Sequence, residues 1–301
     1  MKCLNRDGVK ALVLDLYVFP EACIFVCVIA NMKVNVNHYL KDSNGNTISL
    51  SSCRVIWWRR PQPLELHPEI TDLSYRYIAM NECQQAISGL WLGLDVFWIN
   101  HPIRTEQAAS IPYQLKVAQR VGLEIPSTLI TNNPEEVTQF VSQYGIENTV
   151  YKAFTATELN WRETRLFDPQ ELNLLDNLRF APVIFQEYIP AQFDLRITII
   201  GDDVFAASIY SQETSYKVDY RMDMHSARIE PYSLPMDTQE RFKRLMNHLG
   251  LVYGAIEMML TPEGRIIFLE INPAGQWMFI EEHTKQPITE SFSKLLCRYD
   301  K

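Results

Sequence analysis

The chain has 301 residues, of which 47% are hydrophobic and 21% are charged, and its formal net charge at pH 7 is −8. This composition is ample for a core and excludes a disordered chain or a repeat array. The acidic balance gives no broad positive field, so we expect neither nucleic acid nor a membrane as a partner, and a phosphate ligand would need a few local cations. The length predicts one large domain or two to three closely packed subdomains.

The six cysteines form no Cys-x-x-Cys pair and no dense framework. This pattern favours free thiols in a reducing compartment, so we expect a cytoplasmic protein. The apolar run at residues 22–30 is about half as long as a bilayer-spanning helix, and it predicts a buried strand instead.

The first hundred residues are typical of an α/β region. We expect strands at 10–15, 22–29 and 53–60, a hairpin turn at the "SNGN" of 43–46 and a helix over 70–94. Residues 98–110 are expected to be a linker.

The remaining sequence predicts a mixed α+β fold with antiparallel hairpins rather than a regular βαβ alternation. Expected helices lie at 113–122, 133–145 and 238–250, and expected strands at 126–132, 149–154, 181–189 and 194–211, followed by a hairpin over 253–272. Asn133 is a predicted N-cap, Pro134 suits a first helical turn, and Glu135 and Glu136 suit the positive helix end.

The second strand of the final hairpin carries polar side chains two positions apart. Glu270 and Asn272 share one face because side chains alternate along a strand. The same alternation predicts Phe268 on that face, with Leu269 and Ile271 directed into the core.

A hairpin turn centred just after residue 262 would bring a third polar side chain to this face. It places Glu257 opposite Phe268, on the side of Glu270 and Asn272, although one extra residue would reverse the faces of one strand. Two carboxylates and an amide oxygen suit Mg²⁺, which completes its shell with water and substrate phosphates. The alternative is that both glutamates are surface residues of a half-exposed sheet.

Phosphates require cations, and the candidates are Lys152, Arg196 and Arg221. Lys152 has apolar neighbours and would be costly to bury without an anion, whereas at an exposed sheet edge it would be harmless. Arg196 could equally form a surface ion pair with Asp194. The break in "FQEYIP" can expose backbone groups to an adenine ring, with the carboxylate of Glu187 near ribose hydroxyls.

Taken together, Lys152, "FQEYIP", "DLRITIIGD", "GAIEMMLTPEGRIIFLEINPAGQW" and "HTKQPIT" resemble ATP-grasp ligases of the ribosomal-protein-S6-glutamate-ligase type. The nearest similarity is to the ATP-grasp maturases that close lactone and lactam rings in microviridin-like peptides. It covers about residues 53–297. The resemblance implies an ATP-grasp fold with a pre-ATP-grasp domain at 1–105, a central subdomain at 106–190 and a C-terminal subdomain at 191–301.

The resemblance also implies the chemistry. A carboxylate of a peptide or protein substrate would attack the γ-phosphate of ATP, and an amine or hydroxyl would capture the acyl phosphate. The implied ligands are Lys152 for phosphate, Glu257, Glu270 and Asn272 for Mg²⁺, Arg196 and Arg221 for the transferring phosphoryl group, Gln186, Glu187, Tyr188 and Ile189 for adenine, and Asp194 for ribose.

The sequence departs from the family pattern at several points. Relatives carry an Asn-Lys-Pro-Tyr-Gln-Leu-like run whose lysine contacts phosphate, and here Ile111 stands at that position. Relatives more often have aspartate at the position of Glu257, and the N-terminal domain looks shortened. These departures leave open a weakened nucleotide-binding module, and a small-molecule amino-acid ligase would use the same ATP site. A homodimer is also left open.

Overall fold

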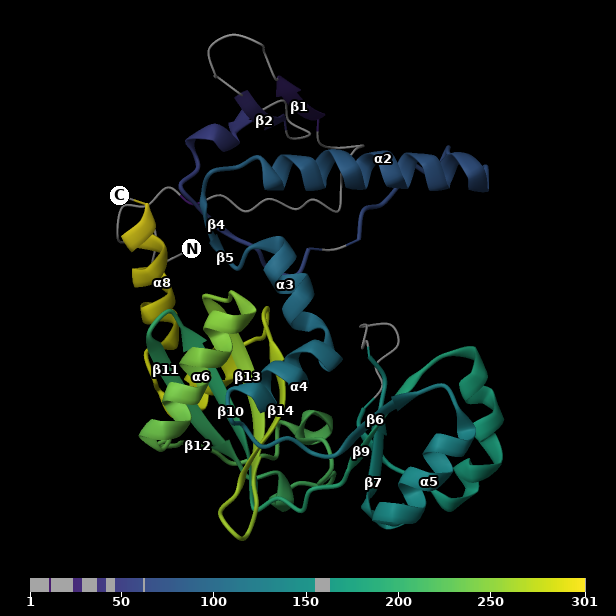
Figure 1. Cartoon of the computed structure of the whole chain (residues 1–301). Helices are drawn as coiled ribbons and strands as arrows, with labels where there is room; N and C mark the ends of the chain where they lie inside the picture. Colours follow the sequence, from purple (N-terminus) through teal and green to yellow (C-terminus); the bar gives the residue numbers. More distant parts are fainter. Residues whose placement is uncertain are drawn as a thin grey trace. The chain divides into compact units, whose positions relative to one another are not determined.

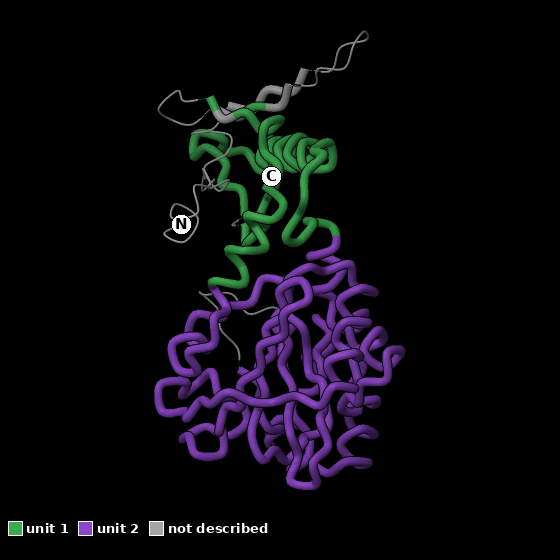
Figure 2. Tube along the Cα trace, turned by 90° about the vertical axis from the view of Figure 1, so that its left-hand side faces the viewer, with its two compact units in different colours: residues 1–103, 290–301 green, residues 104–289 purple. Residues whose placement is uncertain are grey.

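The computed structural model describes residues 11, 24–28, 37–41, 47–61, 63–154 and 163–300 (Figure 1). The chain divides into two compact units, one of residues 1–103 with 290–301 and the other of residues 104–289 (Figure 2). Most of the C-terminal helix α8 (Ile288–Tyr299) therefore groups with the N-terminal unit. The sequence instead suggested a single C-terminal subdomain running to residue 301.

The first unit contains a small antiparallel sheet and a parallel strand pair. The sheet consists of β1 (Ile24–Val28), β2 (Asn37–Lys41) and β3 (Thr47–Ser49), followed by the 3₁₀ turn η1 (Leu50–Ser52). The parallel pair is β4 (Val55–Trp57) and β5 (Phe97–Ile99), connected through helix α2 (Leu73–Leu92). The predicted strands at 22–29 and 53–60 and the helix at 70–94 are confirmed.

Of the other expectations for this region, one is wrong and two lie almost wholly outside the described residues. Residues 98–110 are not a linker, because they hold the end of β5 and helix α3 (Pro102–Ala109). The turn at 43–46 and, apart from Ala11, the strand at 10–15 lie outside the described residues.

Aromatic packing holds the first unit together. Trp91 and Trp98 meet edge to face with their ring centroids 6.1 Å apart, and Trp58 contacts both. The ring of Tyr299 on α8 stacks on Phe97 of β5 at 3.5 Å. Within the described residues, no helix is both long and apolar enough to cross a membrane.

The second unit contains two antiparallel sheets. The four-stranded sheet has the order β6 (Thr128–Thr131), β9 (Val183–Glu187), β7 (Thr149–Lys152), β8 (Arg165–Leu166). The five-stranded sheet has the order β12 (Ile229–Pro231), β11 (Asp203–Ile209), β10 (Phe193–Ile200), β13 (Tyr253–Leu260), β14 (Ile266–Asn272). The helices are α4 (Ile111–Arg120), α5 (Pro134–Tyr144), α6 (Met236–Leu249) and α7 (Met278–Thr284), and the 3₁₀ segments are η2 (Ile146–Asn148), η3 (Pro169–Phe180), η4 (Ser211–Glu213) and η5 (Tyr220–Asp223).

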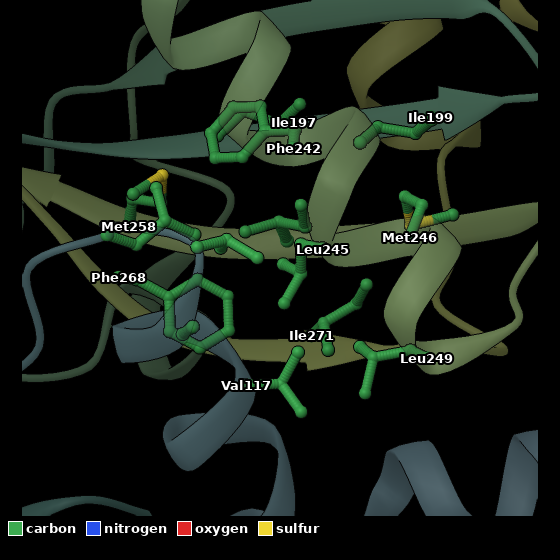
Figure 3. Packing of buried hydrophobic residues seen from close by; sticks show 14 of the residues in the cluster. Val117, Ile197, Ile199, Phe242, Leu245, Met246, Leu249, Met258, Phe268 and Ile271 are labelled. Carbon is green, nitrogen blue, oxygen red and sulfur yellow. The ribbon is translucent and has the colours of Figure 1, made fainter.

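One face of the five-stranded sheet forms the main core with α4 and α6 (Figure 3). On β10, Leu195, Ile197 and Ile199 point into this core and are almost completely buried. Because side chains alternate along a strand, Asp194 and Arg196 lie on the opposite face. The sheet thus separates an apolar core from a polar site.

The start of α5 confirms the predicted capping. The side chain of Asn133 accepts a hydrogen bond from the Glu135 N–H at 3.0 Å, and Pro134 occupies the first turn. This satisfies one of the free N–H groups of the helix end.

The pairing of β13 with β14 corrects the expected register. Met258 lies opposite Phe268, but Glu257 lies opposite Glu270, so Leu269 is an extra residue in a β-bulge. The predicted pairing of Glu257 with Phe268 is therefore wrong. Phe268 points into the core beside Met258 (Figure 3).

The bulge changes which side chains reach the polar face. Near the turn, Met259 pairs with Ile267 and Met258 pairs with Phe268. If this register continued without a bulge, Glu257 would lie opposite Leu269 and the Glu270 side chain would face the core. The extra residue returns Glu270 to the polar face and places Leu269 there as well. The expected convergence of Glu257 and Glu270 is thus correct, although the reason is different.

Hydrogen bonds at the outer edge of β14 support the bulge from both sides. The Phe268 N–H donates to the Glu124 carbonyl at 2.7 Å, before the bulge. The Ile271 N–H donates to Oε1 of the buried Gln114 on α4 at 2.5 Å, after it. The "PYQL" segment therefore fixes the strand that carries Glu270.

The structure also gives Ile111 a role. Its side chain is 9% exposed and belongs to the main core with Leu115 and Val117 of α4. It does not line the polar cavity described below. An apolar residue therefore suits this position as the chain is folded here.

We expect Ile111→Lys to destabilise the protein rather than to improve nucleotide binding. An uncompensated charge in the core should lower the free energy of unfolding by about 3 kcal/mol. Urea unfolding measures the change, with Ile111→Leu as a volume-conserving control that should lose less than about 1.5 kcal/mol. Unchanged stability together with tighter ATP binding would contradict this assignment.

Candidate active site

Three charged side chains form one row across the polar face of the five-stranded sheet. Arg196 of β10 lies opposite Glu257 of β13, which lies opposite Glu270 of β14. The Arg196 Nη1 donates to Glu257 Oε1 at 2.5 Å. Two carboxylates on adjacent strands repel each other unless cations lie beside them.

A second cation reaches this row from the four-stranded sheet. Lys152, the last residue of β7, places its Nζ 3.1 Å from Glu270 Oε2. The positive charge of Lys152 lowers the pKa of the Glu270 carboxyl, although burial acts in the opposite direction, and Arg221 adds to the lowering. Glu270 is therefore ionised at neutral pH, as a metal ligand must be.

The two sheets enclose a cavity at this place. Its lining includes most of the site residues that the sequence predicted: Lys152, Gln186, Glu187, Tyr188, Ile189, Asp194, Arg221, Glu257 and Glu270. Arg196 and Asn272 do not line it. Arg196 is buried beside Glu257, and Asn272 lies one row further along the sheet, opposite Ala255.

One part of the cavity is apolar and suits a flat aromatic base. It is lined by Val150, Ile189, Met259 and Leu269, the last of which is exposed to the cavity by the bulge. The Gln186 amide donates to Thr128 Oγ1 at 3.0 Å. This arrangement fits the predicted adenine side of the site.

The acidic residues beside this region have defined partners. Glu187 accepts a hydrogen bond from the Ser127 N–H at 3.3 Å. Asp194 is buried, and burial raises its pKa to about 7, while a hydrogen bond with Ser211 acts in the opposite direction. Asp194 thus lines the inner part of the cavity as a buried side chain and is not an exposed carboxylate.

Arg221 has a partner that the sequence analysis missed. Its Nε and Nη2 each donate to a carboxylate oxygen of Asp219 at 2.7 Å, which fixes the plane of the guanidinium. The Thr164 N–H donates to Asp219 as well, at 3.2 Å. The spacing Asp-Tyr-Arg was visible in the sequence, but the fork depends on the turn of η5.

The donor set fits Mg²⁺. No group of three or more His, Cys, Asp or Glu side chains in the described part of the chain could hold a metal by itself. Glu257 and Glu270 face each other, and the Asn272 Oδ1 accepts one hydrogen bond, from the Ala274 N–H at 2.9 Å, so a lone pair remains. Few protein ligands are typical of Mg²⁺, which keeps water and phosphate oxygens in its shell.

Comparison with family models decides the identity of this fold. Residues 1–106 match the MvdD pre-ATP grasp domain, and residues 112–296 match the RimK-like ATP-grasp domain. The chain belongs to the RimK-like ATP-grasp family. It is an ATP-dependent ligase with a pre-ATP-grasp domain, and ligases of this kind use ATP with Mg²⁺.

Individual relatives agree with this assignment. A probable alpha-L-glutamate ligase 2 of Shewanella amazonensis is 24% identical over 214 residues, which cover 68% of this chain and 69% of the relative. The macrocyclase MdnC of Microcystis aeruginosa, solved with its precursor peptide MdnA, is 30% identical with a TM-score of 0.85 over 99% of this chain and 94% of MdnC. A RiPP-associated ATP-grasp ligase of Chryseobacterium gregarium, solved with ADP and a leader and core peptide, is 28% identical with a TM-score of 0.87 over 99% and 91% of the two chains.

We expect Glu270→Gln to abolish ATP turnover with little loss of fold. The change keeps the size of the side chain but removes a charge from the candidate metal-binding pair, and it leaves Lys152 without its ionic partner. ADP release measures turnover, and circular dichroism measures the fold.

The matched control is Glu124→Gln, which removes an exposed ion pair with Arg265 at the outer edge of β14 and outside the cavity lining. It should keep wild-type turnover. Full turnover in Glu270→Gln would show that Glu270 is not a metal ligand.

The buried carboxyl of Asp194 predicts a pH dependence of stability. Its folded pKa of about 7 lies above the ordinary 3.8, so its contribution is complete below about pH 4 and is lost as the pH rises to about 7. The asparagine in the variant Asp194→Asn carries no charge at any of these pH values. As the pH rises from about 4 to about 7, the free energy of unfolding of the wild type should therefore fall relative to that of the variant. Parallel curves from urea unfolding at several pH values would contradict the raised pKa.

Proposed function

We propose that this ligase joins a carboxyl group of a peptide to an amine or hydroxyl group, through an acyl phosphate. The observation that carries the proposal is the row Arg196–Glu257–Glu270, with Lys152 and Arg221 at the same cavity. A peptide substrate is supported by MdnC and the Chryseobacterium ligase, both of which are described with bound peptides.

The two bond-forming steps balance without an enzyme nucleophile. A carboxylate oxygen of the substrate attacks the γ-phosphorus of ATP, and ADP leaves. The amine or hydroxyl then attacks the acyl carbon, phosphate leaves, and the attacking group loses a proton. Catalysis of this kind depends on positioning and on neutralising charge.

The side chains that line the cavity, together with Arg196 and Asn272 beside it on the same face of the sheet, suit these requirements. Lys152 is proposed to hold phosphate oxygens, and Arg196 and Arg221 to neutralise the transferring phosphoryl group. Glu257, Glu270 and Asn272 are proposed to hold Mg²⁺, which supplies charge compensation when bound. Gln186, Glu187, Tyr188 and Ile189 are assigned to adenine, and Asp194 to the ribose side.

The remaining sequence predictions stay proposals. The substrate carboxylate, the absence of nucleic acid as a partner, a homodimer and a cytoplasmic location rest on composition and resemblance alone. Cys53 and Cys83 are free thiols, which fits a reducing compartment. Ile111 is buried in the core and does not line the cavity, which weakens the argument that this residue marks an ATP site without catalytic activity.

The function is tested with ATP, Mg²⁺ and peptides that carry both a carboxylate and a lysine, serine or threonine. We expect ADP release that depends on the peptide, and a product lighter than the substrate by one water for each bond formed within it. Mass spectrometry and an ADP assay measure the two quantities. ADP release with free amino acids but with no peptide would instead support a small-molecule ligase.

A further inference from the structure

The loop after β14, residues 273–276, folds back over the polar face of the sheet, and we call it the return loop. The Ala274 N–H donates to the Asn272 side chain at 2.9 Å, and the Gly275 N–H donates to the Asn272 carbonyl at 3.3 Å. These bonds turn the chain sharply directly after the proposed metal-binding strand. The loop therefore lies close to Ala255 and Arg196.

Gly275 makes the closest approach. A Cβ atom at this position would lie 2.4 Å from Ala255 Cβ and 2.9 Å from Arg196 Nη2. Both distances are shorter than van der Waals contact allows, so any larger residue must lift the loop from the sheet. Glycine is required here first by the approach of the backbone to Ala255, and the same approach brings the loop against the Arg196 guanidinium.

A buried hydroxyl anchors the loop in this position. Tyr253 of β13 is 1% exposed, and its hydroxyl donates to the Gly275 carbonyl at 2.5 Å. Its ring meets Trp277 edge to face, with the ring centroids 5.4 Å apart. The loop is thus held at its centre and at its C-terminal side.

The next carbonyl of the loop holds the guanidinium. Arg196 Nη2 donates to the Gln276 carbonyl at 3.2 Å, and Arg196 Nη1 donates to Glu257. The buried Arg196 Nε has no hydrogen-bond partner among the described residues. The orientation of this guanidinium therefore depends on two anchors, and only one of them is a side chain.

We propose that Tyr253 and Gly275 are positioning residues, which hold the Arg196 guanidinium toward the transferring phosphoryl group through the return loop. This inference rests on the role proposed above for Arg196. If the loop is lifted or loosened, the Gln276 carbonyl moves away and the guanidinium can rotate about its contact with Glu257. Recognition of the γ-phosphate should then weaken, while the rest of the nucleotide is bound as before.

The test compares the affinities of ADP and the non-hydrolysable analogue AMPPNP by calorimetry with Mg²⁺ present, so no peptide is needed. We expect Gly275→Ala to weaken AMPPNP binding about tenfold, close to the loss of one hydrogen bond to a charged group, and Tyr253→Phe to weaken it about threefold, as for a lost neutral hydrogen bond. ADP affinity should stay within about twofold of wild type. Arg196→Lys, as the reference, should show the same selective loss.

Tyr151→Phe is the matched control. It removes a 2.6 Å hydrogen bond from a tyrosine hydroxyl to Glu171, in the same unit and outside the cavity lining. Both nucleotide affinities should be unchanged. If Gly275→Ala does not fold, Tyr253→Phe decides the question, because it adds no atoms to the core.

Several outcomes would overturn the inference. These are unchanged AMPPNP affinity in both loop variants or in Arg196→Lys, equal weakening of ADP and AMPPNP, and a loss in Tyr151→Phe as large as that in Tyr253→Phe. The variants could show the expected selective loss of AMPPNP binding while the wild-type protein forms no bond in any peptide. That result would overturn the proposed function and leave this inference supported.

Discussion

The site depends on one extra residue in β14. The bulge at Leu269 brings Glu270 directly opposite Glu257, and without it Glu270 would point into the apolar core. A buried carboxylate among apolar side chains would be ionised only at great cost, so the bulge determines the charge as well as the position. The same residue exposes Leu269 to the cavity, where it contributes to the apolar wall.

The two carboxylates are tolerated because cations reach them from three different segments. Arg196 comes from β10, Lys152 from the other sheet, and Arg221 from η5, where Asp219 fixes it. Each cation contacts a carboxylate, so no charge in this group lies buried by itself. Removing one partner should therefore cost more than the pair contributes, because the other charge would be left uncompensated.

The sequence predicted the elements better than it predicted the contacts between them. Alternation along strands and the capping of α5 are local properties, and they indicated the strands and the helix start correctly, whereas most of the cavity-lining residues were implied by the family resemblance. Alternation also placed Phe268 on the polar face and Leu269 in the core, and both of these expectations are wrong. The bulge at Leu269 could not be foreseen, because it depends on Gln114 and Glu124 binding the outer edge of β14. Likewise, the grouping of α8 with the first unit depends on ring stacking such as that of Tyr299 on Phe97, which no local pattern encodes.

The ion pair between Lys152 and Glu270 connects the two sheets that enclose the cavity. On the roles proposed above, a nucleotide with Mg²⁺ would add anionic phosphates and a cation together, so phosphate would replace the carboxylate beside Lys152 and the metal would replace the lysine beside Glu270. Neither charge would be left unpaired by this exchange. The free-energy cost of removing the two charges from water, which folding has already met, would therefore not increase. The ion pair thus holds the lysine proposed for phosphate and the glutamate proposed for Mg²⁺ beside each other before the nucleotide arrives, which is the preorganisation that phosphoryl transfer requires.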